Sequence, residues 1–162
     1  MLRETLLKAW QESWEGTRRG DEKREVERLR EYLTSADRLA VVTGNENKLR
    51  AVNRVLRRFG LSEAEMVRVP TEMADATLCP AIFKAIMGVQ ASNADVVIAR
   101  GRLGVPGSGA MTVFMDARCR LLTAALSPPH VIHEMSVEEA MEREVEEALR
   151  RLGMKENTPH LR

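Results

Sequence analysis

A strand that runs directly into a polar turn is encoded by residues 39–48, LAVVTGNENK, and this stretch decides the expected fold. Its first half, residues 39–43, is almost entirely apolar, which is typical of a strand buried on both faces of a sheet. Its second half places a Gly-Asn turn ahead of an apolar periodicity that ends at Gly60, which predicts a helix. A buried strand followed by such a helix is the opening of an α/β unit.

The rest of the chain continues this alternation. Further strands are predicted at residues 66–69, 95–99, 110–115, 121–127 and 131–135. Helices are predicted to begin at Pro80 and after Ser136, where Glu139 completes a capping box. The strands at 110–115 and 121–127 are expected to form an antiparallel hairpin. The predicted fold class is therefore α/β, with a mixed β-sheet flanked by helices.

The length of 162 residues predicts a single α/β domain over residues 1–162. Residues 1–35 are expected to form an N-terminal helical extension, residues 36–152 a nucleotide-binding core, and residues 153–162 a loose tail. Trp10 and Trp14 continue an apolar stripe in the extension, and this stripe belongs either to the core or to a dimer surface.

The composition is that of a globular protein, with 44% hydrophobic and 30% charged residues. No apolar run approaches the roughly 20 residues of a membrane helix, and the N-terminus lacks the apolar segment of a secretion signal. Two cysteines are too few for a disulfide framework. We therefore expect a soluble, cytoplasmic protein with no membrane partner.

The positive charge is concentrated in the middle of the chain. Residues 38–133 carry 12 basic and 7 acidic side chains, although the net charge of the whole chain is only +1. Such an excess favours an anionic ligand. Nucleic acid is an unlikely partner on this pattern, because aromatic residues make up only 4% of the chain.

The first candidate site is the turn itself, with Thr43, Gly44, Asn45, Asn47 and Lys48. Backbone N–H groups at a helix N-terminus suit a phosphate. Lys48 opposes the helix dipole by about 0.3 kcal/mol or more, so its position needs another reason, which a bound triphosphate would supply. The alternative is an ordinary strand-to-helix turn capped by Asn45, with Lys48 in solvent.

The second candidate site is a glycine-rich loop expected after the strand at 95–99. Its candidate binding residues are Arg100, Gly101, Arg102, Gly104, Pro106, Gly107, Ser108 and Gly109. Arginines bind phosphates in a bidentate manner, and glycines leave backbone N–H groups accessible. The alternative is a flexible connector with incidental arginines.

The third candidate site is the segment with Ser127, Pro128 and His130. Two consecutive prolines present Ser127 and His130 rigidly, and His130 is either a general base, a contact to a base ring or a structural residue. Asp116 and Asp95 are the carboxylates considered for Mg²⁺, with a turn residue as the alternative for Asp116.

The motifs bear a family resemblance. Residues 41–48, VVTGNENK, resemble the T-G-N-x-x-K opening of the inosine triphosphate pyrophosphatase superfamily, where the motif lies on a triphosphate-binding turn. The wider pattern of residues 101–109, Asp116 and residues 126–130 is similar to the methanogen guanylyltransferases of iron-guanylylpyridinol (FeGP) cofactor biosynthesis, which serve the iron-only (Fe) hydrogenase. The resemblance spans residues 36–152.

This resemblance implies an inosine triphosphate pyrophosphatase-like fold and a homodimeric transferase that uses Mg²⁺. The implied reaction transfers GMP from GTP to the hydroxyl of a pyridinol and releases pyrophosphate, with Lys48 and His130 as the expected catalytic residues. Pyrophosphatases of the superfamily carry an acidic D-S-G-type motif where this chain reads IARGRLG at residues 98–104, which favours transfer over hydrolysis. The alternatives are a nucleoside triphosphate pyrophosphatase and a non-catalytic nucleotide or nucleic-acid binding protein.

Overall fold

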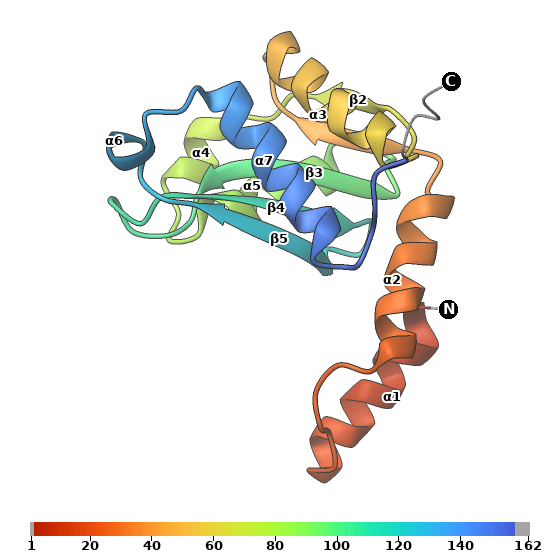
Figure 1. Cartoon of the computed structure of the whole chain (residues 1–162). Helices are drawn as coiled ribbons and strands as arrows, with labels where there is room; N and C mark the ends of the chain where they lie inside the picture. The colour runs from red at the N-terminus through yellow and green to blue at the C-terminus, as the bar shows by residue number, and fades with distance from the viewer. Residues whose placement is uncertain (1, 158–162) are drawn as a thin grey trace, which may run out of the picture.

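Helices and strands alternate along the core of the computed structural model, which describes residues 2–157 (Figure 1). In chain order the elements are α1 (Leu2–Glu15), α2 (Lys23–Ser35), β1 (Leu39–Val42), α3 (Glu46–Arg58), β2 (Ala64–Val67), α4 (Thr71–Asp75), α5 (Pro80–Gln90), β3 (Val96–Arg102), β4 (Ala110–Asp116), β5 (Leu121–Ser127), α6 (His130–His133) and α7 (Val137–Arg150). None of the helices in this part of the chain is long and apolar enough to span a membrane.

The five strands form one mixed sheet in the order β2-β1-β3-β4-β5. The strand β1 pairs in parallel with β2 and with β3, whereas β3, β4 and β5 are antiparallel to one another. The predicted α/β class, the mixed sheet and the hairpin between β4 and β5 are therefore confirmed.

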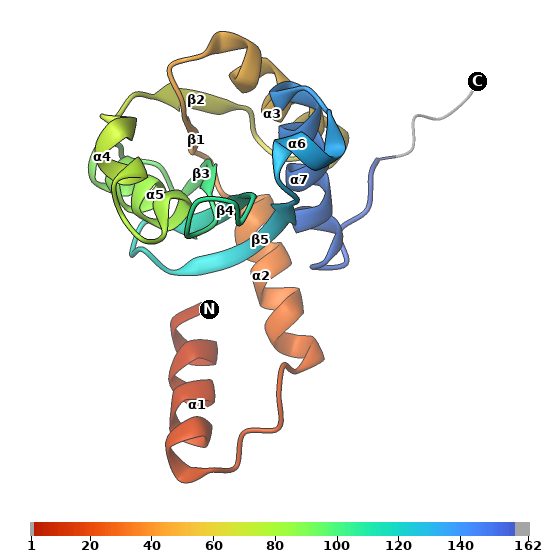
Figure 2. The same cartoon turned by 90° about the vertical axis from the view of Figure 1, so that its left-hand side faces the viewer.

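Different helices cover the two faces of the sheet (Figures 1 and 2). The helices α3 and α7 pack together on one face, and α5 packs on the other. In β1, Leu39 and Val41 belong to the core on the α3 side, and Ala40 and Val42 belong to the core on the α5 side. Because side chains alternate between the faces of a strand, burial on both faces requires an apolar residue at every position of β1.

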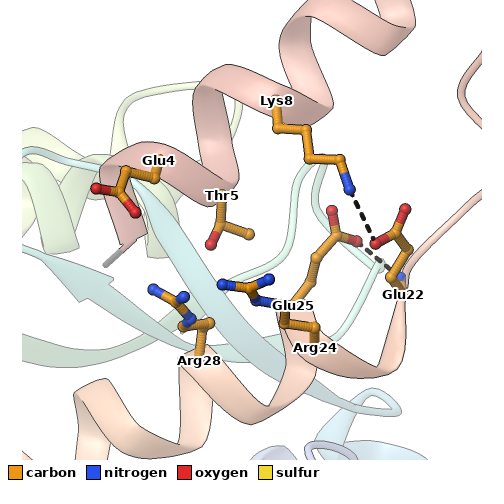
Figure 3. A pocket seen from close by; sticks show the side chains of 7 residues that line it. All are labelled: Glu4, Thr5, Lys8, Glu22, Arg24, Glu25 and Arg28. Carbon is orange, nitrogen blue, oxygen red and sulfur yellow. Dashed lines mark hydrogen bonds and ion pairs between the residues drawn. The ribbon is translucent and has the colours of Figure 1, made fainter.

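The first two helices form an arm that extends away from the sheet (Figures 1 and 2). Leu33 of α2 is fully buried in the core, but α1 has no buried residue. Where α1 and α2 face each other, they enclose a hollow of about 120 Å³ lined mainly by charged side chains (Figure 3). There the Lys8 ammonium lies 3.5 Å from the Glu22 carboxylate. Trp10 and Trp14 are 68% and 87% exposed, so the alternative that placed them in the core is wrong.

The expected strand at residues 131–135 is wrong, because the chain forms the short helix α6 there. Pro129 precedes this helix with φ −53° and ψ 141°, and Glu134 ends it with a left-handed φ of 52°. Val131 and Ile132 are 86% and 70% exposed, so these apolar side chains do not belong to the sheet or its core. The source of the error was the β-branched pair Val131-Ile132, whose strand propensity has no effect here without a partner strand.

Several boundaries also differ from expectation, and one helix was not predicted. The second strand begins two residues earlier than predicted, at Ala64, and the helix α4 was not expected. The third strand continues to Arg102, because β4 offers it a partner along its whole length. The tail is not loose at its start: Met154 is buried in the core, and the Asn157 N–H donates to the Arg58 carbonyl over 2.7 Å. The rest of the predicted tail lies outside the described residues.

Candidate functional site

The predicted site segments meet at one edge of the sheet. Val41 of β1 lies beside Ile98 of β3, so Thr43 and Arg100 follow this pair on neighbouring strands. Further along, Arg102 lies opposite Ala110, which lies opposite Ser127. This edge, called the carboxyl edge below, contains the carboxyl ends of β1, β3 and β5. In open α/β sheets, ligands bind outside the carboxyl ends of strands where the strand order reverses, as it does here at β1.

The turn between β1 and α3 is well ordered by its own side chains. The Thr43 hydroxyl accepts from the Asn45 N–H over 3.1 Å. The Asn45 side chain caps α3 by accepting from the N–H groups of Asn47 and Lys48, over 2.8 and 3.4 Å. Capping is therefore present, and it satisfies two of the donors that a phosphate would use. Any anion at this turn would rely more on the Lys48 side chain than on these two N–H groups.

Arg100, Gly101 and Arg102 lie on β3 rather than in the predicted loop. The strand holds Gly101 against the start of α5, where an added Cβ would lie 3.0 Å from the Ala81 Cα. The Arg102 guanidinium donates to the carbonyls of Gly104 and Asp75, over 2.7 and 2.9 Å. Gly101 and Arg102 therefore have packing and loop-fixing roles, which leaves Arg100 as the more available phosphate ligand.

The remaining loop, residues 103–109, folds back onto itself and onto the end of β5. The Ser108 hydroxyl accepts from the Gly104 N–H over 3.0 Å, and the Leu103 N–H donates to the Gly109 carbonyl over 2.9 Å. Gly109 has φ +88°, and a Cβ there would lie far inside van der Waals contact of the Ser127 carbonyl oxygen. A glycine is therefore required where the second and third candidate segments touch.

A cavity of about 410 Å³ opens at this junction, called the edge cavity below. Its lining residues are Arg100, Gly101, Arg102, Gly107, Gly109, Ala110, Pro128, Pro129, His130, Met135, Val137 and Ala140. The cavity thus unites the arginines of β3, the glycine loop, the Pro-Pro-His segment and the start of α7. Its size falls within the range of small-molecule sites.

His130 is exposed at the first position of α6 and lines this cavity, so it is placed to contact a bound ligand. Ser127 ends β5 beside the cavity, and its backbone carbonyl faces Gly109. Pro106 is exposed at the tip of the loop and does not itself line the cavity, although the adjacent Gly107 does.

Lys84 is a site residue that the sequence analysis missed. It lies on α5, and its ammonium donates to the Arg100 carbonyl over 3.0 Å. Burial lowers the pKa of Lys84 below its ordinary value, and the charge of Lys48 lowers it further, as does that of Arg100, while Asp75 opposes them. Lys48, Lys84 and Arg100, called the cation cluster below, are therefore arranged so that Lys48 and Arg100 disfavour the charge on Lys84, and an anion bound beside Lys84 would relieve this repulsion.

Glu144 was also missed. This α7 carboxylate is 1% exposed, and it accepts from the Arg100 Nε over 2.9 Å and from the Thr112 hydroxyl over 3.2 Å. A charged residue on an otherwise apolar helix face was the sequence signal that could have identified both residues. Glu144 lies among the buried Ala140, Met141 and Ala148 of α7. Lys84 likewise interrupts the apolar helix α5. Both charges lie where their helices meet the carboxyl edge.

Asp95 and Asp116 lie at the opposite edge of the sheet, where Val96 pairs with Asp116. The Asp95 carboxylate accepts from the N–H groups of Asp37 and Arg38, over 3.1 and 3.0 Å. The Asp116 carboxylate accepts from two backbone N–H groups of its own turn and from the Arg120 side chain over 2.6 Å. The structure therefore does not bring these carboxylates to the carboxyl edge. Within residues 2–157, no three His, Cys, Asp or Glu side chains are grouped as metal ligands.

The arrangement suits the binding of a polyphosphate. Three basic side chains on separate elements, one of them already paired with Glu144, can donate hydrogen bonds to a polyphosphate next to a cavity that can hold the rest of a nucleotide. A cluster of carboxylates that could activate water is absent from this edge among the described residues.

Comparison with known proteins identifies a family for this chain. The family model described as "FeGP cofactor biosynthesis protein HcgB, guanylyltransferase" matches residues 2–154. Among solved structures, protein VC0702 from Vibrio cholerae is similar, with 15% sequence identity and a TM-score of 0.43. That match covers 65% of this chain and 66% of the other, just under two thirds of its length. The relationship to inosine triphosphate pyrophosphatases stays a prediction.

Replacing Gly109 tests the contact between the loop and β5. Gly109→Ala should lower the free energy of unfolding by more than Gly107→Ala, since both have positive φ but only Gly109 is crowded by a neighbouring backbone. Strain from φ alone amounts to about 1–2 kcal/mol, so Gly107→Ala measures this part. Urea unfolding of the two variants provides the comparison, and equal losses would show that the close approach is unimportant.

Replacing Lys84 tests the cation cluster. Lys84→Met should weaken the binding of pyrophosphate by about 10-fold or more, because a hydrogen bond to a charged group contributes about 1.5–3 kcal/mol. Isothermal titration calorimetry measures this affinity. Lys8→Met is the control, because Lys8 lies on the arm and pairs with Glu22.

The same titration has a pH signature. A bound polyanion favours the charged form of Lys84, whose pKa in the free protein is lowered from 10.5. The affinity should therefore fall as the pH rises through this lowered pKa, with proton uptake on binding in that range. Buffers of different ionisation enthalpy report the uptake. If Lys84→Met shows the same uptake as the wild type, another group is responsible.

Proposed function

Because this chain belongs to the HcgB family of FeGP cofactor biosynthesis guanylyltransferases, we propose that it transfers GMP from GTP to the hydroxyl of a pyridinol and releases pyrophosphate. The family makes the chain a nucleotidyltransferase of FeGP cofactor biosynthesis. The identity of the donor and the acceptor belongs to the proposal. The observation that supports it most is the cation cluster of Lys48, Lys84 and Arg100 beside the edge cavity.

In the proposed reaction, the pyridinol oxygen forms a bond to the α-phosphorus as the bond from that phosphorus to the bridging oxygen of pyrophosphate breaks. The hydroxyl proton leaves to a base or to solvent, and the negative charge that develops moves to the pyrophosphate. The cation cluster would stabilise this charge. A pyridinol is more acidic than an alkyl alcohol, so a weak base such as His130 suffices, and positioning becomes the main contribution of the protein.

Mg²⁺ is proposed as part of the nucleotide substrate rather than as a resident cofactor. The groups near the carboxyl edge are mainly cationic, and the described residues offer no carboxylate cage. Mg²⁺ commonly keeps several waters and binds through substrate phosphates, so it would enter with GTP. The chain's own residues would then bind the phosphate oxygens that Mg²⁺ leaves free.

We further propose that the chain acts as a homodimer that uses the outer surface of α1. Leu7, Trp10, Gln11 and Trp14 line an exposed apolar groove on this helix. The side of α1 that faces α2 is lined by charged groups instead (Figure 3). An apolar surface turned outward on a projecting arm is typical of an interaction site.

The reaction is tested by incubating the protein with GTP and Mg²⁺, with and without a pyridinol, and resolving the products by mass. We expect release of pyrophosphate and a GMP–pyridinol adduct only when the pyridinol is present. GMP formed without pyridinol would instead identify a nucleoside triphosphate pyrophosphatase. Binding without turnover in either mixture would identify a nucleotide-binding protein and contradict the proposal.

The dimer is tested by sedimentation equilibrium. The wild-type chain should sediment as a dimer, and the double variant Trp10→Ser/Trp14→Ser should sediment as a monomer, because it removes most of the exposed aromatic area. Leu121→Ser is the control, since Leu121 is 51% exposed on β5. If Leu121→Ser dissociates the dimer and the tryptophan variant does not, the interface lies on the outermost strand, β5, instead.

A further inference from the structure

Glu144 is a charge placed where the fold itself does not require one. Its neighbours on the buried face of α7 are apolar, and its side chain is 1% exposed. Removing a carboxylate from water costs several kcal/mol, and replacing a buried ion pair by apolar residues is often neutral or stabilising. The presence of Glu144 therefore suggests a purpose other than stability.

The contacts of Glu144 show what it holds in place. One carboxylate oxygen accepts from the Arg100 Nε over 2.9 Å, and the other accepts from the Thr112 hydroxyl over 3.2 Å. Arg100 and Thr112 face each other across the β3–β4 ladder. Side chains of β3 and β4 thus fix the Glu144 carboxylate of α7, and this carboxylate in turn holds the Nε edge of the Arg100 guanidinium.

The other edge of this guanidinium remains available. Within residues 2–157, the terminal nitrogens of Arg100 have no hydrogen-bond partner, and Arg100 lines the edge cavity with its side chain 18% exposed. A guanidinium held through Nε keeps its two terminal nitrogens for a second, planar interaction, and this geometry matches phosphate oxygens. Arg102 is not equivalent, because its Nε and one of its terminal nitrogens donate to backbone carbonyls.

We propose that Glu144 is a positioning residue, which orients Arg100 so that its terminal N–H groups bind a phosphate of the nucleotide. This inference rests on the proposed function, because it takes GTP as the ligand. Glu144 itself does not touch the substrate. It acts by restricting Arg100 to one orientation before the nucleotide arrives, which reduces the ordering that binding would otherwise require.

The test compares two glutamates of the same helix. Glu144→Gln keeps an oxygen that accepts from the Arg100 Nε but removes the charge. Glu146→Gln is the matched control, because Glu146 pairs with Arg150 and Arg58 away from the cavity. Titration calorimetry measures the affinity for GTP and for guanosine, which lacks phosphates. Thermal unfolding confirms that each variant is folded at the temperature of the titration.

We expect Glu144→Gln to weaken GTP binding by about 10- to 100-fold, as small misplacements of a positioning group do. Guanosine binding should be unchanged, and Glu146→Gln should alter GTP binding by less than about twofold. The double variant Arg100→Met/Glu144→Gln leaves no unpaired buried charge, and it should bind GTP no better than Glu144→Gln.

Three results would overturn the inference. Unchanged GTP affinity in Glu144→Gln would show that Glu144 is purely structural. An equal loss of affinity for GTP and for guanosine would show a general distortion of the cavity. A wild-type chain that does not bind GTP would overturn the proposed function, and the inference with it, so the two failures are distinguishable.

Discussion

Parallel pairing of β1 with β3, in the register that sets Val41 beside Ile98, brings distant segments of the chain to one edge of the sheet. The turn before α3 and Arg100 of β3 become neighbours only because β1 and β3 run in the same direction. The antiparallel register of β3, β4 and β5 then adds Ala110 and Ser127 to the same edge. Leu39 and Val41 pack into one core and Ala40 and Val42 into the other, so a slip of β1 by one residue would exchange side chains of different size between the two cores.

The same sheet separates its charges by edge. Lys48, Lys84 and Arg100 gather at the carboxyl edge, whereas the carboxylates of Asp95 and Asp116 satisfy backbone N–H groups at the opposite edge. Among the described residues, the buried carboxylate at the carboxyl edge is that of Glu144, and it is ion-paired with Arg100. Such a site suits the binding of a polyphosphate. The chain belongs to a guanylyltransferase family, whose members act on a nucleotide.

The sequence predicts the parts of the fold that depend on local pattern. The apolar run of β1 and the proline at the start of α5 each act within a few residues, and both predictions are confirmed. The cap of α3 by Asn45, which was one alternative for its turn, is equally local and is present. The helix α6 was mistaken for a strand because exposure of Val131 and Ile132 depends on the absence of a partner strand. Lys84 and Glu144 were missed for a similar reason. A single charge on an apolar helix face can be assigned to a site only when the packing of the helix on the sheet shows which residue it contacts, here Arg100. The close approach of Gly109 to Ser127 is likewise a product of tertiary structure.

A crystal structure with a GTP analogue that has a methylene group between its α- and β-phosphorus atoms tests the central claim most directly. The account predicts the β- and γ-phosphates within hydrogen-bonding distance of the Lys48, Lys84 or Arg100 side chains, and the guanosine in the edge cavity near His130. Phosphates bound at the opposite edge beside Arg118 and Arg120, or in the hollow between α1 and α2, would contradict it.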